Sequence, residues 1–169
     1  MSNPPLALDN VDAKWLRQSL DKSGIKWRVI VVSACYSGSF INDLTSPNTL
    51  VITASAANKS SFGCSNEAEY TYFGQAFFAE SLPKLRRFGP AFEAASKSIA
   101  EREKMMGFEP SEPQFVMGDA IKKVLPTFED SLKPAPIVIV QQATTTASSA
   151  APTASTTKID IPVQVTVAK

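Results

Sequence analysis

Cys35 is the residue in this sequence whose surroundings best suit covalent chemistry. It follows the hydrophobic run Arg28–Ala34 and precedes the turn Ser37-Gly38-Ser39, which leads into a helix expected at about 38–44. A thiol beside a helix N-terminus lies close to backbone amides, which favour the thiolate and lower its pKa. The same amides can hold an oxyanion. The position therefore favours a nucleophilic cysteine, and a buried structural cysteine is the alternative.

The rest of the sequence excludes several kinds of site. It contains no histidine, so these 169 residues alone form no Ser-His-Asp triad, Cys-His dyad or histidine metal site. A phosphatase loop would need arginine at Ile41, and a thioredoxin-like motif would need cysteine at Gly38. The second cysteine, Cys64, completes neither a disulfide framework nor a zinc ligand set. We therefore expect no metal and no other cofactor.

Charge and hydrophobicity exclude further classes of partner. Lys and Arg number 17 and Asp and Glu number 16, a net charge of +1 that gives no electrostatic indication of nucleic acid binding. No stretch reaches the roughly 18 apolar residues of a membrane span. Residues 1–5 lack the basic and apolar regions of a signal peptide. As it stands, the sequence predicts a cytoplasmic protein with no membrane span and no nucleic acid partner.

The elements around Cys35 indicate an α/β fold. A helix is expected at about 11–23, capped by Asn10, ended by Gly24 and covering a sheet with its apolar stripe. The continuous β-branched run at 28–34 predicts a strand buried on both faces, as in a parallel sheet. A second buried strand is expected at 49–55. The apolar stripe of the helix consists of Val11, Trp15, Leu16 and Leu20.

Further elements are expected after a long polar loop at 56–70, which leaves the end of the second strand where α/β proteins place their sites. They are a helix at 71–82 that Pro83 ends, a helix at 90–106 that Gly107 ends, a strand at 114–118 and a helix at 119–125. The inward residues are Phe73, Ala76 and Phe77 in the first helix and Phe92, Ala95, Ile99 and Met106 in the second.

The composition changes at residue 134. Residues 141–157 hold 14 Ala, Ser or Thr out of 17 and no charge, which is linker composition. A short strand is predicted at 137–140, and residues 159–167 are predicted either as an edge strand, to which Pro162 limits them, or as an exposed, sticky tail. The chain therefore divides into a domain at 1–133 and an Ala-, Thr-, Ser- and Pro-rich tail at 134–169.

Four short motifs follow one another between residues 33 and 74. They are Ser33-Ala34-Cys35-Tyr36-Ser37-Gly38, Ile52-Thr53-Ala54-Ser55-Ala56-Ala57-Asn58, Ser60-Ser61-Phe62-Gly63-Cys64 and Thr71-Tyr72-Phe73-Gly74. In this order and spacing they resemble the C13 family of cysteine peptidases, which are the legumain-like asparaginyl endopeptidases and their bacterial relatives. The resemblance covers about 10–125. It implies a three-layer caspase-like α/β fold with a mostly parallel sheet, present here as the C-terminal part of the domain.

The resemblance also implies the catalytic roles. Cys35 would be the nucleophile, and the Cys35 amide with the turn at Gly38 would be left to hold the oxyanion. The general base of the family is a histidine in a His-Gly pair on the preceding strand, and this sequence contains no such pair. Cys64 matches a structural cysteine of the family.

The pocket for the substrate side chain carries over only in part. Ser60 and Ser61 match the serine pair that lines this pocket in legumains. Ser33 stands where legumains have a glutamate, and Gln75 stands where they have an aspartate. The specificity of legumains for asparagine is therefore not expected to transfer.

Three functions remain open for the sequence. The first is a cysteine endopeptidase of peptide or protein substrates, inactive as this histidine-free chain. The second is a non-catalytic homologue that binds peptides or proteins through the cleft that binds substrate in the active peptidases. The third is an unrelated α/β domain with Cys35 in its core, against which the motif series speaks. An open apolar edge on the 28–34 strand would favour self-association, or cover by 137–140 or 159–167.

Overall fold

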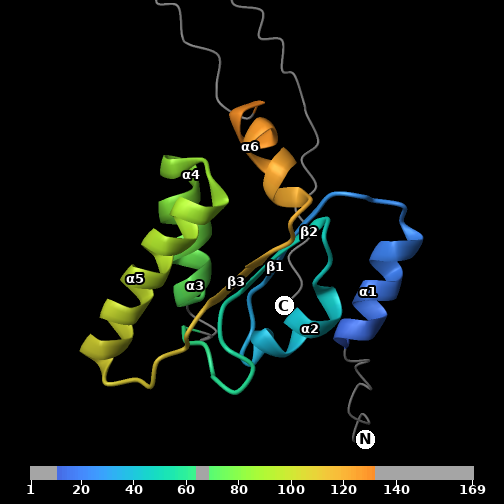
Figure 1. The fold of residues 1–169 in the computed structure, drawn as a ribbon. Helices are drawn as coiled ribbons and strands as arrows, with labels where there is room; N and C mark the ends of the chain where they lie inside the picture. The colour runs from blue at the N-terminus through green and yellow to red at the C-terminus, as the bar shows by residue number, and fades with distance from the viewer. Residues whose placement is uncertain (1–10, 64–68, 132–169) are drawn as a thin grey trace, which may run out of the picture. The chain divides into compact units, whose positions relative to one another are not determined.

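The computed structural model describes residues 11–63 and 69–131. Their centre is a three-stranded sheet of strands β1 (Arg28–Val32), β2 (Thr49–Thr53) and β3 (Gln114–Met117), in the order β1-β2-β3. Figure 1 shows α1 and α2 on one side of the sheet and α3, α4 and α5 on the other. This confirms the α/β class and agrees with the three layers that the resemblance implies.

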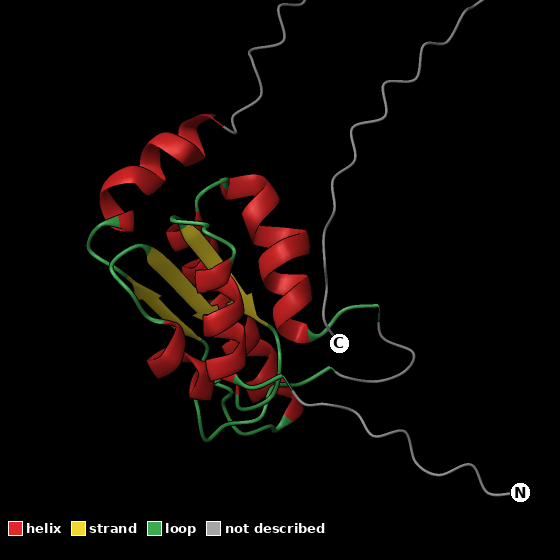
Figure 2. Cartoon of the chain, turned by 90° about the vertical axis from the view of Figure 1, so that its right-hand side faces the viewer, coloured by secondary structure: helices red, strands yellow, loops and turns green. Residues whose placement is uncertain are grey.

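The sheet is mixed rather than mostly parallel. β1 and β2 pair in parallel, from Arg28 opposite Thr49 to Val32 opposite Thr53. β2 and β3 pair in antiparallel, with Leu50 opposite Met117. The three strands lie side by side in Figure 2.

The two parallel strands are buried to different degrees. All five residues of β2 are buried, since it is paired on both edges and covered on both faces, and this confirms the second buried strand. All five residues of β1 are only half-buried. Among the described residues β1 is paired on one edge alone, so the expectation of a strand buried on both faces is wrong for it.

The first layer contains α1 (Ala13–Lys22), the 3-10 turn η1 (Ser37–Phe40) and α2 (Ile41–Leu44). The cap of α1 is Asp12 rather than Asn10, because its carboxylate accepts a hydrogen bond from the Trp15 N–H at 2.6 Å. Gly24, at φ +73°, follows the helix as predicted. No residue of α1 is buried, and Trp15 is 57% exposed. The helix contacts α2, so its predicted stripe covers little of the sheet.

One continuous helical segment begins the second layer. It consists of α3 (Tyr72–Gly74), the π-helical turn η2 (Gln75–Ser81) and α4 (Leu82–Leu85). Its start confirms the predicted helix at 71–82, but Pro83 does not end it. The wider π turn bonds the Leu82 N–H to the Phe77 carbonyl, five residues back, so the helical path continues where a proline would interrupt a regular α-helix. The segment ends at Arg86, whose φ is +53°.

The second layer is completed by α5 (Phe88–Met106) and α6 (Ile121–Ser131). Gly107 follows α5 at φ +69°, as predicted. Met106 is 58% exposed and not in the core, because it is the last residue of the helix. α6 is longer than the predicted 119–125, since its buried positions Ile121, Leu125 and Glu129 recur every four residues beyond that range.

The hydrophobic core lies between β2 and the second layer. It confirms the inward residues Phe73, Ala76, Phe77, Ala95 and Ile99, and Phe92 packs against it. Within the described residues no helix is long and apolar enough to cross a membrane. Cys64, the strands predicted at 137–140 and 159–167, and the domain boundary near 134 lie outside the described residues.

Candidate active site

Cys35 lies at the carboxyl end of β1 and is exposed. Because β1 and β2 are parallel, their carboxyl ends meet at the same edge of the sheet. The loop that leaves β2 therefore reaches Cys35, and it brings Ser60 and Ser61 into contact with the thiol. The alternative of a buried core cysteine is excluded by this exposure.

The sulfur of Cys35 receives hydrogen bonds from two neighbouring serines, and the Ser61 hydroxyl oxygen also lies 3.8 Å from it. The Ser60 hydroxyl donates to Sγ at 3.3 Å, and the Ser61 backbone N–H donates at 3.4 Å. A protonated thiol can donate in turn to the Ser61 carbonyl at 3.3 Å. The Ser60 hydroxyl first and the Ser61 N–H second lower the pKa of the Cys35 thiol below its ordinary value, because both stabilise the thiolate. The direction agrees with the sequence analysis, but the largest causes are these two serines and not the start of the following helix.

The backbone turns sharply directly after the thiol. Tyr36 has φ +58° and ψ 20°, a left-handed conformation that costs energy in a residue with a side chain. Its N–H donates to the Lys59 carbonyl at 2.8 Å, and its carbonyl accepts from the Ser39 hydroxyl at 2.7 Å. Non-glycine residues with such a backbone are uncommon and occur at turns and helix ends, as at Arg86, as well as at functional sites.

Gly38 lets the turn approach the loop that follows β2. A Cβ on Gly38 would overlap the backbone of Ala56 and Ala57, so only glycine fits. The close approach brings the Cys35 turn against the loop that carries Ser60. The role of Gly38 in an oxyanion site stays a prediction.

A buried pair of serines, which the sequence analysis missed, lies beneath the turn. Ser37 and Ser55 are both 0% exposed, and each backbone N–H donates to the hydroxyl of the other. The signal in the sequence is a serine just past each of two apolar strands, Ser37 between Tyr36 and Gly38 and Ser55 between Ala54 and Ala56. That signal is weak, because serine at a strand end is common.

The remaining predicted pocket residues are joined to each other rather than to Cys35. The Ser33 and Thr71 hydroxyl oxygens lie 3.2 Å apart, and Thr71 caps α3 by accepting from the Gly74 N–H. Gln75 follows one turn later, and its N–H donates to the Thr71 carbonyl. Its side chain accepts from Arg102 at 3.0 Å and donates to Glu80 at 2.9 Å.

Three contacts, with Tyr72 and with Phe108 and Ser111 of the segment that follows α5, hold the loop that carries Ser60 and Ser61. The Tyr72 N–H donates to the Phe62 carbonyl, and Phe62 stacks on Phe108 with ring centroids 4.5 Å apart. The carbonyl of Ser111 accepts from the Ala56 N–H at 2.9 Å. Ser111 is in turn held by the buried carboxylate of Glu103, which accepts its N–H at 3.0 Å. Glu103 therefore has a structural role behind the site.

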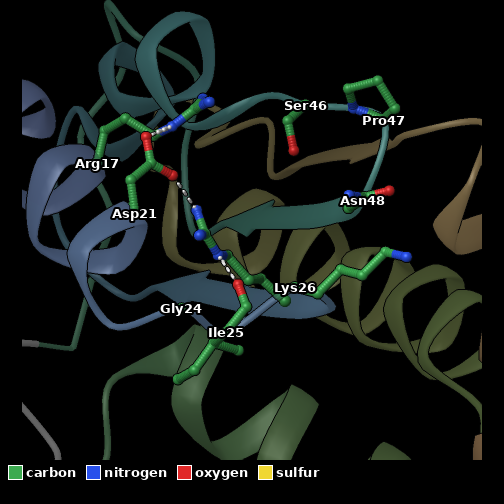
Figure 3. Close-up of a pocket in the computed structure, with 9 residues that line it drawn as sticks. Arg17, Asp21, Gly24, Ile25, Lys26, Ser46, Pro47 and Asn48 are labelled. Carbon is green, nitrogen blue, oxygen red and sulfur yellow. Dashed lines mark hydrogen bonds and ion pairs between the residues drawn. The ribbon is translucent and has the colours of Figure 1, made fainter.

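A cavity of about 390 Å³ lies at the opposite, amino ends of β1 and β2 (Figure 3). Asp21 lies between Arg17 at 2.8 Å and Arg28 at 2.6 Å. Arg28 also donates to the Ile25 and Leu20 carbonyls. Asp21 and the two arginines thus bind each other and the backbone, and the ammonium of Lys26 lies over the Trp27 ring, 5.0 Å from its centroid. In the described ranges no cluster of three His, Cys, Asp or Glu residues suits a metal ion.

A comparison with protein families identifies the chain. The model of the peptidase C13 family matches residues 1–149 of the 169. No curated protein matches the chain. The chain therefore belongs to the peptidase C13 family, which confirms the resemblance drawn from the motifs.

Proposed function

We propose that this member of the peptidase C13 family is a cysteine endopeptidase in which Cys35 is the nucleophile. The observation that carries the proposal is the exposed Cys35 sulfur, which accepts hydrogen bonds from Ser60 and from the Ser61 N–H. A thiolate with two such donors and no covering side chain is a competent nucleophile. The strained turn at Tyr36 is a second feature expected of a catalytic position.

The reaction needs more than the nucleophile. Sγ would attack the carbonyl carbon of the peptide bond, and the C–N bond would break as the amine leaves with a proton from a general acid. Water would then hydrolyse the thioester and regenerate the thiol. The 169 residues contain no histidine to supply or accept these protons. We therefore propose that this chain by itself reacts with electrophiles but does not turn over peptides, because each missing acid–base step costs orders of magnitude in rate.

The substrate is proposed to be a peptide or protein whose side chain lies among neutral polar groups. Ser33, Ser60, Ser61 and Gln75 are the proposed pocket residues, and the Cys35 amide with the Gly38 turn is proposed to hold the oxyanion. Gln75 places a neutral amide where legumains have an aspartate, and Arg102 and Glu80 hold this amide in place. Asparagine specificity is not part of the proposal.

The test uses the full chain carrying Cys64→Ala, so that Cys35 is its only thiol. We expect iodoacetamide at pH 7 to label Cys35 about tenfold faster than an unstructured thiol peptide, because more of it is thiolate. We also expect no cleavage of a fluorogenic peptide library, with the additional change Cys35→Ala as the matched control. Labelling no faster than the peptide would contradict the nucleophile. Cleavage that depends on Cys35 would contradict the inactivity of the chain.

The alternative is a protein that binds peptides without hydrolysing them, favoured by the absence of histidine. The full chain carrying Cys64→Ala also distinguishes this alternative from the peptidase. Saturable binding of a library peptide, with labelling of Cys35 at the ordinary thiol rate, would favour this alternative over the peptidase.

A further inference from the structure

The two buried serines at the carboxyl ends of β1 and β2 form a reciprocal arrangement. The Ser37 N–H donates to Ser55 Oγ at 3.2 Å, and the Ser55 N–H donates to Ser37 Oγ at 3.1 Å. The two hydroxyl oxygens are 3.3 Å apart. Ser55 Oγ also donates to the Ala34 carbonyl at 3.3 Å. We call these two residues the serine clamp.

The serine clamp holds the chain on both sides of the thiol. Ala34 precedes Cys35, and Ser37 follows the strained residue Tyr36, so Ser55 bonds to the backbone at each end of this dipeptide. Its hydroxyls are shielded from water, because both side chains are 0% exposed. A buried hydrogen bond of this kind is costly to break without replacement. The clamp can therefore maintain a left-handed backbone at Tyr36 that the chain would otherwise relax.

The clamp also sets the distance between the thiol and its donors. Cys35 comes from the segment after β1, whereas Ser60 and Ser61 come from the loop after β2, and Ser55 begins that loop. Apart from the contacts of Cys35 itself, the turn and the loop are joined by the Tyr36–Lys59 hydrogen bond and by the close packing of Gly38. Each of these two links holds the turn at one point. The serine clamp, by contrast, bonds to residues on both sides of the Cys35–Tyr36 pair.

We propose that Ser37 and Ser55 are positioning residues that hold Cys35 Sγ within hydrogen-bond distance of Ser60 and the Ser61 N–H. The proposal rests on the proposed nucleophilic role of Cys35 and adds the device that makes the thiol reactive. Neither serine touches the sulfur. Their effect on reactivity passes through the backbone turn alone.

The experiment follows the pH dependence of iodoacetamide labelling in the full chain carrying Cys64→Ala. In this reaction the thiolate displaces iodide and forms a C–S bond, so the rate reports the thiolate fraction. Ser55→Ala removes the bonds on both sides of the dipeptide, and we expect labelling at pH 7 to slow about threefold to tenfold with a shift of the profile to higher pH. Ser37→Ala keeps both bonds of the Ser55 hydroxyl, from the Ser37 N–H and to the Ala34 carbonyl, and removes only the hydroxyl that accepts from the Ser55 N–H, so we expect a smaller shift in the same direction.

The control is Ser96→Ala, which removes another buried hydroxyl that has no hydrogen-bond partner among the described residues. We expect its labelling profile to match that of the parent chain. Circular dichroism confirms that each variant is folded, and Ser37→Ala carries the test if Ser55→Ala does not fold. Reduced thermal stability with an unchanged labelling profile would show a merely structural pair and overturn the proposal. An ordinary thiol profile in the parent chain would instead overturn the nucleophilic role of Cys35.

Discussion

The two ends of β1 carry polar clusters of different kinds. At the amino end, Arg28 and Arg17 hold the carboxylate of Asp21 between them. At the carboxyl end, the uncharged donors of Ser60 and Ser61 surround the sulfur of Cys35. The amino end contains the larger number of charged groups, and the carboxyl end contains the strained backbone and the buried serine clamp.

The two clusters differ in whether their hydrogen-bond donors are already bound to a charge or act on a group that can react. At the amino end Arg17 and Arg28 both bind the one carboxylate of Asp21, and the other donors of Arg28 bind backbone carbonyls. At the carboxyl end the donors stabilise a negative charge that forms only when Cys35 loses its proton. A cavity lined by charges is therefore a structural feature here, and the smaller neutral cluster is the one suited to chemistry.

Glycine substitutions at the two ends should separate them most strongly. A Cβ at Gly38 overlaps the backbone of Ala56 and Ala57, whereas a Cβ at Gly24 has nothing within 4 Å and meets only the strain of its positive φ. We expect Gly38→Ala to lower the free energy of unfolding by about 3 kcal/mol and Gly24→Ala by about 1 kcal/mol. Urea unfolding followed by circular dichroism measures both. Equal losses would contradict the tighter packing at the carboxyl end.

Serine substitutions should give a smaller effect, on reactivity rather than stability. Ser60→Ala removes the donor that lowers the Cys35 pKa most, so the thiol pKa should rise and labelling at pH 7 should slow about threefold. The difference should vanish well above about pH 8.5, where an ordinary thiol is ionised. Ser46→Ala, which removes a hydroxyl 2.7 Å from Thr49 Oγ1 at the amino end, is the matched control. A change with Ser46→Ala as large as that with Ser60→Ala would remove the distinction between the ends.

The smallest effect is expected on the pH dependence of protein stability, through Asp21 at the amino end of β1. Hydrogen bonds from Arg28 first and Arg17 second lower the pKa of Asp21. Its stabilisation is therefore fully present above the ordinary aspartate pKa of about 3.9 and is lost as the pH falls through the lower pKa of the folded protein. We expect Asp21→Asn to reduce the urea midpoint slightly at pH 7 and not at pH 2. Asp43→Asn is the control, and an equal difference at both pH values would contradict the linkage.

The sequence predicted the positions of helices and strands better than their burial and their packing against neighbouring elements. The run at 28–34 and the positions of Gly24 and Gly107 identify a strand and two helix ends, because they depend on local propensity and backbone conformation. Whether β1 is buried depends on its neighbours in the sheet, which no local pattern contains. The continuation through Pro83 depends on a π turn that the sequence does not signal.

The candidate site shows the same contrast, between residues that a local motif identifies and residues whose role depends on a partner distant in the sequence. Cys35, Ser60 and Ser61 are recognisable because the motifs that contain them have a fixed order, and the structure places them in contact. Ser55 could not be found in this way, since its importance comes from a partner in another turn. The direction of the Cys35 pKa shift could be predicted from its place before a turn and an expected helix N-terminus, but its main donor comes from 25 residues away.

The register of the sheet has a consequence for the order in which the protein folds. Arg28 pairs with Thr49, 21 residues later, whereas Leu50 pairs with Met117, 67 residues later. Closing the longer loop costs about 1 kcal/mol more chain entropy than closing the shorter one. The parallel β1–β2 unit is thus the more local contact, and Cys35, Ser55, Ser60 and Ser61 all belong to it or to its loops. We therefore expect the nucleophile and its donors to meet through the more local of the two strand pairings.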